Sequence, residues 1–94
     1  MTIHFAPKAE ADFAAVVGYL ADRNPTAAAE LGERIFALID KLANAEFEGP
    51  EQTLLSGELV RSWPAPPVRI YYQRRLDAFW VLRIYHQAQP PIVR

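Results

Sequence analysis

The sequence predicts an α+β domain in which an N-terminal strand and a helical hairpin pack on one face of a small antiparallel sheet, in the order β-α-α-β-β-β. Apolar residues recur every three or four positions between residues 9 and 42, which is the spacing of amphipathic helices. Segments within residues 58–86 are rich in β-branched and aromatic residues, as strands are. A chain of 94 residues suffices for one domain with a modest core. We expect that domain to span residues 1–94, with a short extended tail over residues 89–94.

The first strand and the first helix are predicted within residues 3–21. Ile3 and Phe5 alternate with polar neighbours, as in a short strand. After Pro7, apolar residues return at helical spacing up to about residue 21. Gly18 interrupts this pattern at a cost of about 1 kcal/mol relative to Ala. We therefore expect a neighbouring element to approach Gly18 closely.

The second helix is predicted to begin at Asn24-Pro25. Asn24 can cap the helix with its side chain, and Pro25 suits the first helical position, where no N–H is needed. The apolar stripe that follows, with Ile39 at its flank, consists of Ala28, Leu31, Ile35, Leu38 and Leu42. Only three or four residues join the helices, so we expect an antiparallel hairpin. It should bury Phe13, Leu20, Leu31, Ile35, Leu38 and Leu42 against the sheet.

The rest of the sheet is predicted from three segments after an irregular stretch at residues 44–57. Residues 58–63 form the first strand, and the prolines of residues 64–67 mark a loop because proline donates no ladder hydrogen bond. Residues 68–74 and 78–86 form a hairpin, in which the more hydrophobic second strand is central. With helices on one face only, the other face is left as a concave surface for a partner.

Charge divides the chain into two parts. Residues 1–56 carry nine acids and four bases, a net of −5, whereas residues 57–94 carry six arginines and two acids, a net of +4. Arginine suits the recognition of carboxylates and phosphates. Arg61, Arg69 and Arg83 fall on three neighbouring predicted strands, where they either converge on an anionic partner or are solvated residues of the strand faces. The interleaved aromatic rings, Trp63 and Tyr72 among them, either contact that partner or fill the core.

Several functional classes have no support in the sequence. The absence of cysteine excludes disulfides, thiolate metal sites and a cysteine nucleophile. His4 and His86 stand alone without metal-ligand spacing, and no cofactor motif occurs, so we expect neither a metal nor a cofactor. His86 is either a general acid or base or a structural residue. No apolar run is long enough for a membrane span and the start lacks a secretory signal, so we expect a cytoplasmic protein without membrane contact.

Five segments of residues 3–89, in the right order, resemble the ParE/RelE toxin superfamily of type II toxin–antitoxin systems, and most closely its ParE branch. Two of them are Phe5-Ala-Pro-x-Ala9-x-x-Asp12-Phe13 and Asn24-Pro25-x-Ala27-Ala28. The strand sequences are Val60-Arg61-Ser62, Val68-Arg69-Ile70-Tyr71-Tyr72 and Val81-Leu82-Arg83-Ile84-Tyr85-His86. The resemblance implies a toxin that a ParD-like antitoxin neutralises. Because the first half of the chain is acidic, we expect contact with DNA only through this antitoxin. From their places on the predicted strands, we expect the antitoxin or the target to bind at Arg61, Arg69, Arg83, Trp63 and Tyr72.

Two activities occur within the superfamily: ParE-like members inhibit DNA gyrase, and RelE-like members cleave messenger RNA on the ribosome. Arg61 falls where the ribonucleases have one catalytic arginine, and His86 falls where they often have a lysine. Gln89 stands in place of their second catalytic arginine. Arg83 is a substitute for it in the ribonuclease alternative, but it lies several residues earlier in the strand. A neutral amide cannot substitute for a guanidinium, so we expect a gyrase inhibitor rather than an enzyme. The alternatives are a ribonuclease that uses Arg61, Arg83 and His86, and a degenerate member that only binds its antitoxin.

Overall fold

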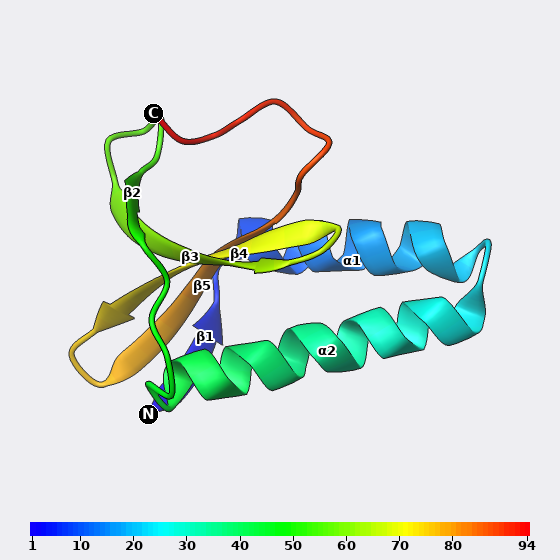
Figure 1. Ribbon diagram of the computed structural model, residues 1–94, viewed down its shortest axis with the longest axis horizontal. Coiled ribbons are helices and arrows are strands. Elements are labelled where there is room, and N and C mark those ends of the chain that lie inside the picture. The colour runs from blue at the N-terminus through cyan, green and yellow to red at the C-terminus, as the bar shows by residue number, and fades with distance from the viewer.

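The computed structural model describes residues 1–94 as two helices packed on one face of a five-stranded sheet (Figure 1). The elements are β1 (Thr2–Phe5), α1 (Pro7–Ala21), α2 (Pro25–Ala43), β2 (Glu51–Thr53), β3 (Leu59–Ala65), β4 (Val68–Arg75) and β5 (Ala78–His86). The predicted α+β class, the helical hairpin and the position of the last strand are confirmed. Neither helix is long and apolar enough to cross a membrane.

The strand order of the sheet is β1-β5-β4-β3-β2, so β5 is an interior strand, as predicted. Three of the four strand pairs are antiparallel, but β1 runs parallel to β5, with Ile3 beside Phe79. The sheet is therefore mixed and not wholly antiparallel. A tight turn makes its two strands antiparallel, whereas these partners lie 76 residues apart in the chain, so no local turn sets their relative direction.

The edge formed by β2 and β3 differs from the prediction in two respects. Residues 51–53, expected to be irregular, form β2, and Pro64, expected in a loop, lies in β3 beside Arg69. The N–H of Ser62 points outward to the carbonyl of Pro50, so Pro64, two residues on, has its nitrogen on the same outer side. Because β2 pairs with β3 only as far as Arg61, no ladder bond is lost at Pro64.

The ends of the helices follow the local signals in the sequence. Asn24 Oδ1 accepts a hydrogen bond from the N–H of Ala27 at 3.0 Å, and Pro25 is the first residue of α2, as predicted. Pro7 likewise begins α1. The expectation for Gly18 is wrong, because a Cβ placed there would have no neighbour within 4 Å.

The main core lies between the hairpin and the sheet. The buried residues of the α2 stripe are Ala28, Leu31, Ile35, Ile39 and Leu42. Leu38, predicted within the stripe, is half-buried, and Ile39, predicted at its flank, is 1% exposed. Phe13 and Leu20 of α1 are also half-buried against this core.

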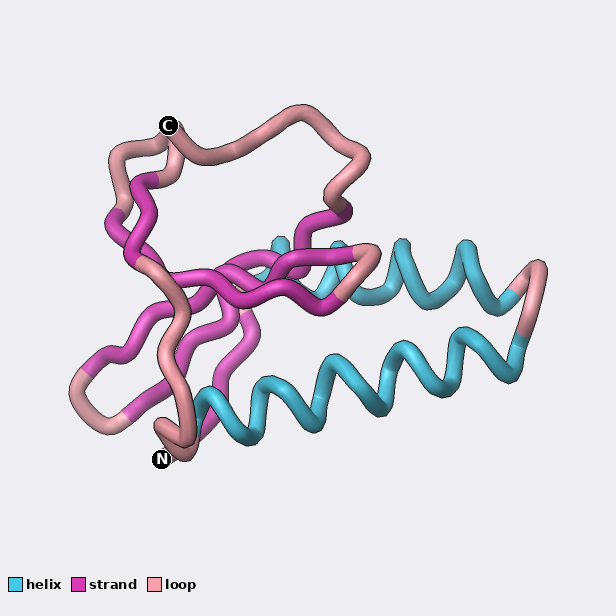
Figure 2. The backbone as a smooth tube through the Cα atoms, in the orientation of Figure 1, coloured by secondary structure: helices cyan, strands magenta, loops and turns pink.

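The opposite face of the sheet carries a second, smaller cluster made of Leu54, Val60, Tyr71 and Leu82. The C-terminal tail returns across the molecule towards β2 (Figure 2), and its Ile92 and Val93 pack on this cluster. The N–H of Leu55 donates to the carbonyl of Ile92 at 2.7 Å. The face predicted to be uncovered is thus partly covered by the chain itself.

A candidate partner-binding groove along α1

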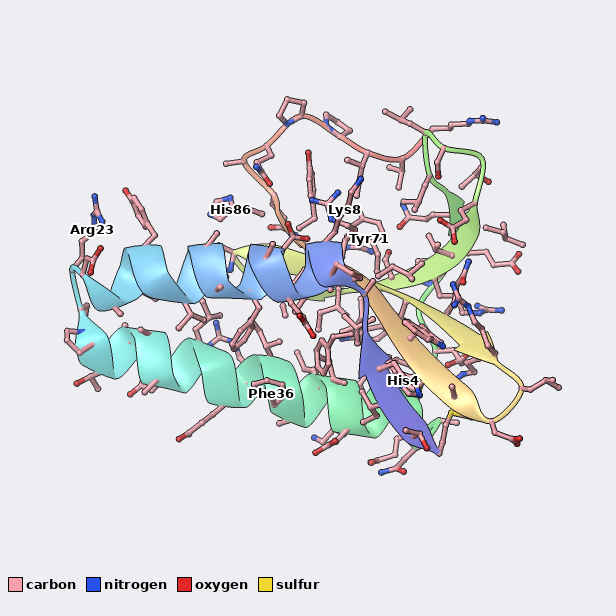
Figure 3. All side chains as sticks on the ribbon, turned by 180° about the vertical axis from the view of Figure 1, so that it is seen from behind. His4, Lys8, Arg23, Phe36, Tyr71 and His86 are labelled. Carbon is pink, nitrogen blue, oxygen red and sulfur yellow. The ribbon has the colours of Figure 1, made fainter.

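Two hollows lie along α1, and together we call them the α1 groove. The first, of about 560 Å³, lies between the start of α1, the tail and the loop before β3; Lys8, Leu54, Leu82 and Ile92 are among its lining residues. The second, of about 550 Å³, follows the later part of α1; Val16, Leu20, Leu31, Ile84 and His86 are among its lining residues. Both linings are rich in apolar residues. In Figure 3, Lys8, Tyr71 and His86 lie between α1 and the tail.

Asp12 and Arg83 separate the two hollows. The Arg83 guanidinium donates to both carboxylate oxygens of Asp12, at 2.7 and 2.9 Å, and Asp12 also accepts the N–H of Ile84 at 3.0 Å. This contact follows from the topology, because β1 pairs with β5 only as far as Val81 and leaves later N–H groups of β5 without a strand partner. The hydrogen bond to Asp12 raises the pKa of Arg83 above its usual value. Arg83 is therefore held in the fold by a bidentate ion pair.

Arg61 lies on the helix-covered face, beside Tyr72. It donates to the carbonyl of Gly49 at 2.8 Å and lies 3.4 Å from a carboxylate oxygen of Glu48. Glu48 is shared with Arg74, whose hydrogen bond is the main reason that the pKa of Glu48 lies below its usual value. Arg61 thus belongs to a charged cluster within the fold.

Arg74 was not among the residues singled out in the sequence, yet it connects three parts of the fold. Besides Glu48, it donates to the carbonyls of Leu42 and Ala43 at the end of α2. Helices end with carbonyls that lack partners, and a nearby cation satisfies them well. No local pattern indicates this contact, because Arg74 lies more than 30 positions after those carbonyls.

Arg69 lies on the opposite face of the sheet from Arg61. Its Nε donates to Ser62 Oγ at 2.8 Å, it pairs across strands with Tyr85, and it makes no ion pair. The structure therefore does not bring Arg61, Arg69 and Arg83 together on one surface.

The two aromatic candidates both face the helices. Trp63 is half-buried and packs against Phe47, with ring centroids 4.4 Å apart. Tyr72 is 0% exposed, stacks on Phe79 and accepts the N–H of Gly49 at 2.8 Å, and burial raises its pKa. Tyr72 is therefore a core residue with its hydroxyl satisfied.

The structure also separates Arg61 from His86, two residues of the ribonuclease alternative. His86 and Gln89 line the second hollow, and His86 Nδ1 accepts the N–H of Ala88 at 3.1 Å. His86 lies beside Val68 of β4, whereas Arg61 lies beside Tyr72 of the same strand. Four strand residues correspond to about 13 Å, so Arg61 and His86 lie near different ends of the sheet.

The fold places the chain in a known structural class. A chain of the chromosomal ParDE toxin–antitoxin system from P. aeruginosa superposes with a TM-score of 0.74, over 92% of this chain and 95% of that chain, at 19% sequence identity. No curated protein matches this chain. The family model described as the ParE toxin of the type II toxin–antitoxin system parDE matches residues 3–91. The chain belongs to this family.

The predicted resemblance is confirmed by this match. The protein is a toxin of a type II toxin–antitoxin system.

Proposed function

We propose that this toxin inhibits DNA gyrase in the cytoplasm and is neutralised by a ParD-like antitoxin. The observation that carries the choice of target is the separation of Arg61 from His86, with the neutral Gln89 beside the latter. An inhibitor that acts by binding gyrase needs only a contact surface. It does not need an acid, a base and a cation gathered at one site.

Cleavage of RNA through its 2′-hydroxyl has stricter requirements. It needs a base, a cation that stabilises the phosphate and an acid for the leaving group. In this chain Arg61 is engaged by Glu48 and Gly49, and Arg83 is engaged by Asp12. Loss of one well-placed charged donor typically costs on the order of 10²–10³ in rate, which argues against growth arrest by RNA cleavage.

The α1 groove is where we place the antitoxin. From Lys8 to Tyr19 it follows twelve residues of α1, about 16 Å at the helical rise, enough for three turns of an amphipathic helix. Apolar linings lie on both sides of the Asp12–Arg83 pair, and Lys8 in the first hollow makes no ion pair. An antitoxin tail with one apolar face and acidic residues beside it fits this lining. DNA is then contacted only through the antitoxin.

Two assays of the purified toxin test the target. We expect inhibition of gyrase-driven supercoiling, while ribosome-bound messenger RNA stays intact. Arg61→Ala and His86→Ala should weaken toxicity only as far as each destabilises the fold, because neither residue performs chemistry in this proposal. Cleavage of messenger RNA at the ribosomal A site, abolished by His86→Ala, would establish the ribonuclease alternative. A chain that binds its antitoxin but neither arrests growth nor inhibits gyrase would be a degenerate member.

A further inference from the structure

Three side chains from adjacent strands form a ladder on the face opposite the helices. His4 of β1 stacks on Trp80 of β5, with ring centroids 4.8 Å apart and an angle of 20° between the planes. The guanidinium of Arg75, from β4, lies 4.7 Å from the centre of the Trp80 ring. Both distances match the spacing of neighbouring strands. Since β5 lies between β1 and β4, the Trp80 ring is held between a histidine and an arginine.

The ladder stands beside the tip of the β4–β5 hairpin, which projects away from the helices (Figure 1). Leu76 at this tip is 100% exposed, although two-residue hairpin turns favour Gly, Asn and Asp. Leu59 is also largely exposed, and its carbonyl accepts a hydrogen bond from Gln73 of β4. Single exposed apolar residues are common, whereas exposed apolar side chains gathered in one region mark interaction sites, so Leu76 points to such a site only together with the ladder beside it.

We infer that His4, Arg75, Leu76 and Trp80, here called the hairpin patch, bind the target protein. This inference rests on the proposed function, in which the toxin acts by contact with gyrase. On the target protein we expect an apolar pocket that accepts Leu76 and, at the rim of that pocket, a carboxylate that pairs with Arg75. The patch contains a tryptophan and an arginine, residue types that dominate binding energy at protein interfaces. Their stacking already restricts the side chains, which lowers the entropy lost on binding.

The charge and the stacking of the patch both favour a protein partner. The nearest carboxylate to the Arg75 guanidinium is that of Glu58 at 4.0 Å, and both side chains are about half-exposed. Such a pair is weak, so the guanidinium is available to a carboxylate of a partner. Recognition of a nucleic acid base by stacking requires a free aromatic face, whereas the Trp80 ring has His4 and Arg75 as its neighbours.

The patch also adjoins the α1 groove. Trp80 is two residues before Leu82, which lines the first hollow, so the two side chains are about 7 Å apart along one strand. A partner seated in the groove therefore lies beside the patch and obstructs a large target protein. Neutralisation by the antitoxin then follows from exclusion.

Two exposed substitutions, Leu76→Asp and Arg75→Glu, test the inference in the full-length toxin. Each should raise the concentration that half-inhibits supercoiling by purified gyrase at least about tenfold and weaken growth arrest on expression. Thermal unfolding should be unchanged, because neither side chain is buried. Arg23→Glu is the matched control, since Arg23 is another exposed arginine that stacks on an aromatic ring, at 3.6 Å from the centre of Tyr19. This control should keep both activities.

The outcomes separate the inference from the proposed function. If the wild type inhibits gyrase and both variants inhibit it as strongly as the wild type, the hairpin patch does not bind the target and the gyrase proposal stands. If the wild type arrests growth without inhibiting gyrase, the gyrase proposal fails. Growth arrest by the variants then tests the hairpin patch: variants that still arrest growth overturn it as the target-binding site, and variants that no longer do so support it. A wild type that neither arrests growth nor inhibits gyrase overturns both the gyrase proposal and the hairpin patch. A concentration-dependent dimer that Leu76→Asp dissociates also overturns the inference, because the patch would then bind a second copy of this chain.

Discussion

Three of the six arginines after residue 57 are held by carboxylates of the same chain. Arg61 and Arg74 share Glu48 and Arg83 binds Asp12, whereas the half-exposed Arg75 lies 4.0 Å from Glu58 in a weak pair. The partners lie up to 71 positions away in the chain. Composition indicated a cationic half, but it could not show which cations are neutralised, because pairing depends on contacts that only the fold creates. The Asn24 cap was predictable because its partner is three residues away.

The Asp12–Arg83 pair should contribute measurably to stability. Its side chains are only 15% and 22% exposed, so Asp12→Ala leaves a largely desolvated guanidinium and an unpaired Ile84 N–H. We expect Asp12→Ala to lower the free energy of unfolding by about 2–4 kcal/mol. In a double-mutant cycle with Arg83→Ala, measured by urea denaturation, the coupling should be about 1–2 kcal/mol.

The half-exposed pair of Arg75 and Glu58, 4.0 Å apart, is the matched control for this cycle. Its coupling should stay below about 0.5 kcal/mol. Equal coupling in the two pairs would contradict a structural role for Arg83.

Among the elements, those with a strong internal pattern were predictable. Residues 78–86 were predicted as a strand and form β5 within the same bounds, because the segment is apolar throughout. The three-residue β2 has no such pattern, since Glu51-Gln52-Thr53 gains its pairing only when β3 lies beside it. In α2 the period of 3.6 residues allows either Leu38 or Ile39 on the buried stripe. The angle at which the helix packs on the sheet decides between them, and the sequence does not contain that angle.

The stripe of α2 gives a prediction about these two neighbours. Ile39→Ala should lower the free energy of unfolding by about 2–5 kcal/mol, because it opens a cavity in a closed core. Leu38→Ala should cost about 1–2 kcal/mol, since a half-buried side chain loses fewer contacts. Chemical denaturation of both variants measures the difference, and a larger loss for Leu38→Ala would show that the helix is rotated from its position here.

At the scale of the whole molecule, the class and order of elements were predictable, and the surfaces were not. The sequence indicated one covered and one open sheet face, but the tail packs Ile92 and Val93 on the second face. The candidate binding site is the α1 groove, and it is not a surface on which Arg61, Arg69 and Arg83 meet. Binding of an acidic antitoxin tail in the groove therefore depends on Lys8, a lining cation that makes no ion pair.

Association with the antitoxin tests this distribution of charge. Lys8→Glu should slow association about threefold at low salt, and by less as salt rises, because the effect is electrostatic. Lys41→Glu on α2 gives the same change of net charge away from the groove and should slow association less. Association rates from stopped-flow mixing measure both variants. Equal rates for the two variants would contradict binding of the antitoxin in the α1 groove.

The pairing of the first strand with the last has a consequence for how the toxin is made. A ribosome synthesises β1 long before its partner residues, 78–81, which follow 76 positions later in the chain. Helices form from local contacts as the chain emerges, whereas a sheet closed by distant segments waits for its final strand. Until Ala78–His86 is synthesised, the apolar stripe of the helical hairpin has no sheet to cover it. A nascent chain is therefore not yet a toxin, and it becomes able to act only once β5 has emerged and paired with β1.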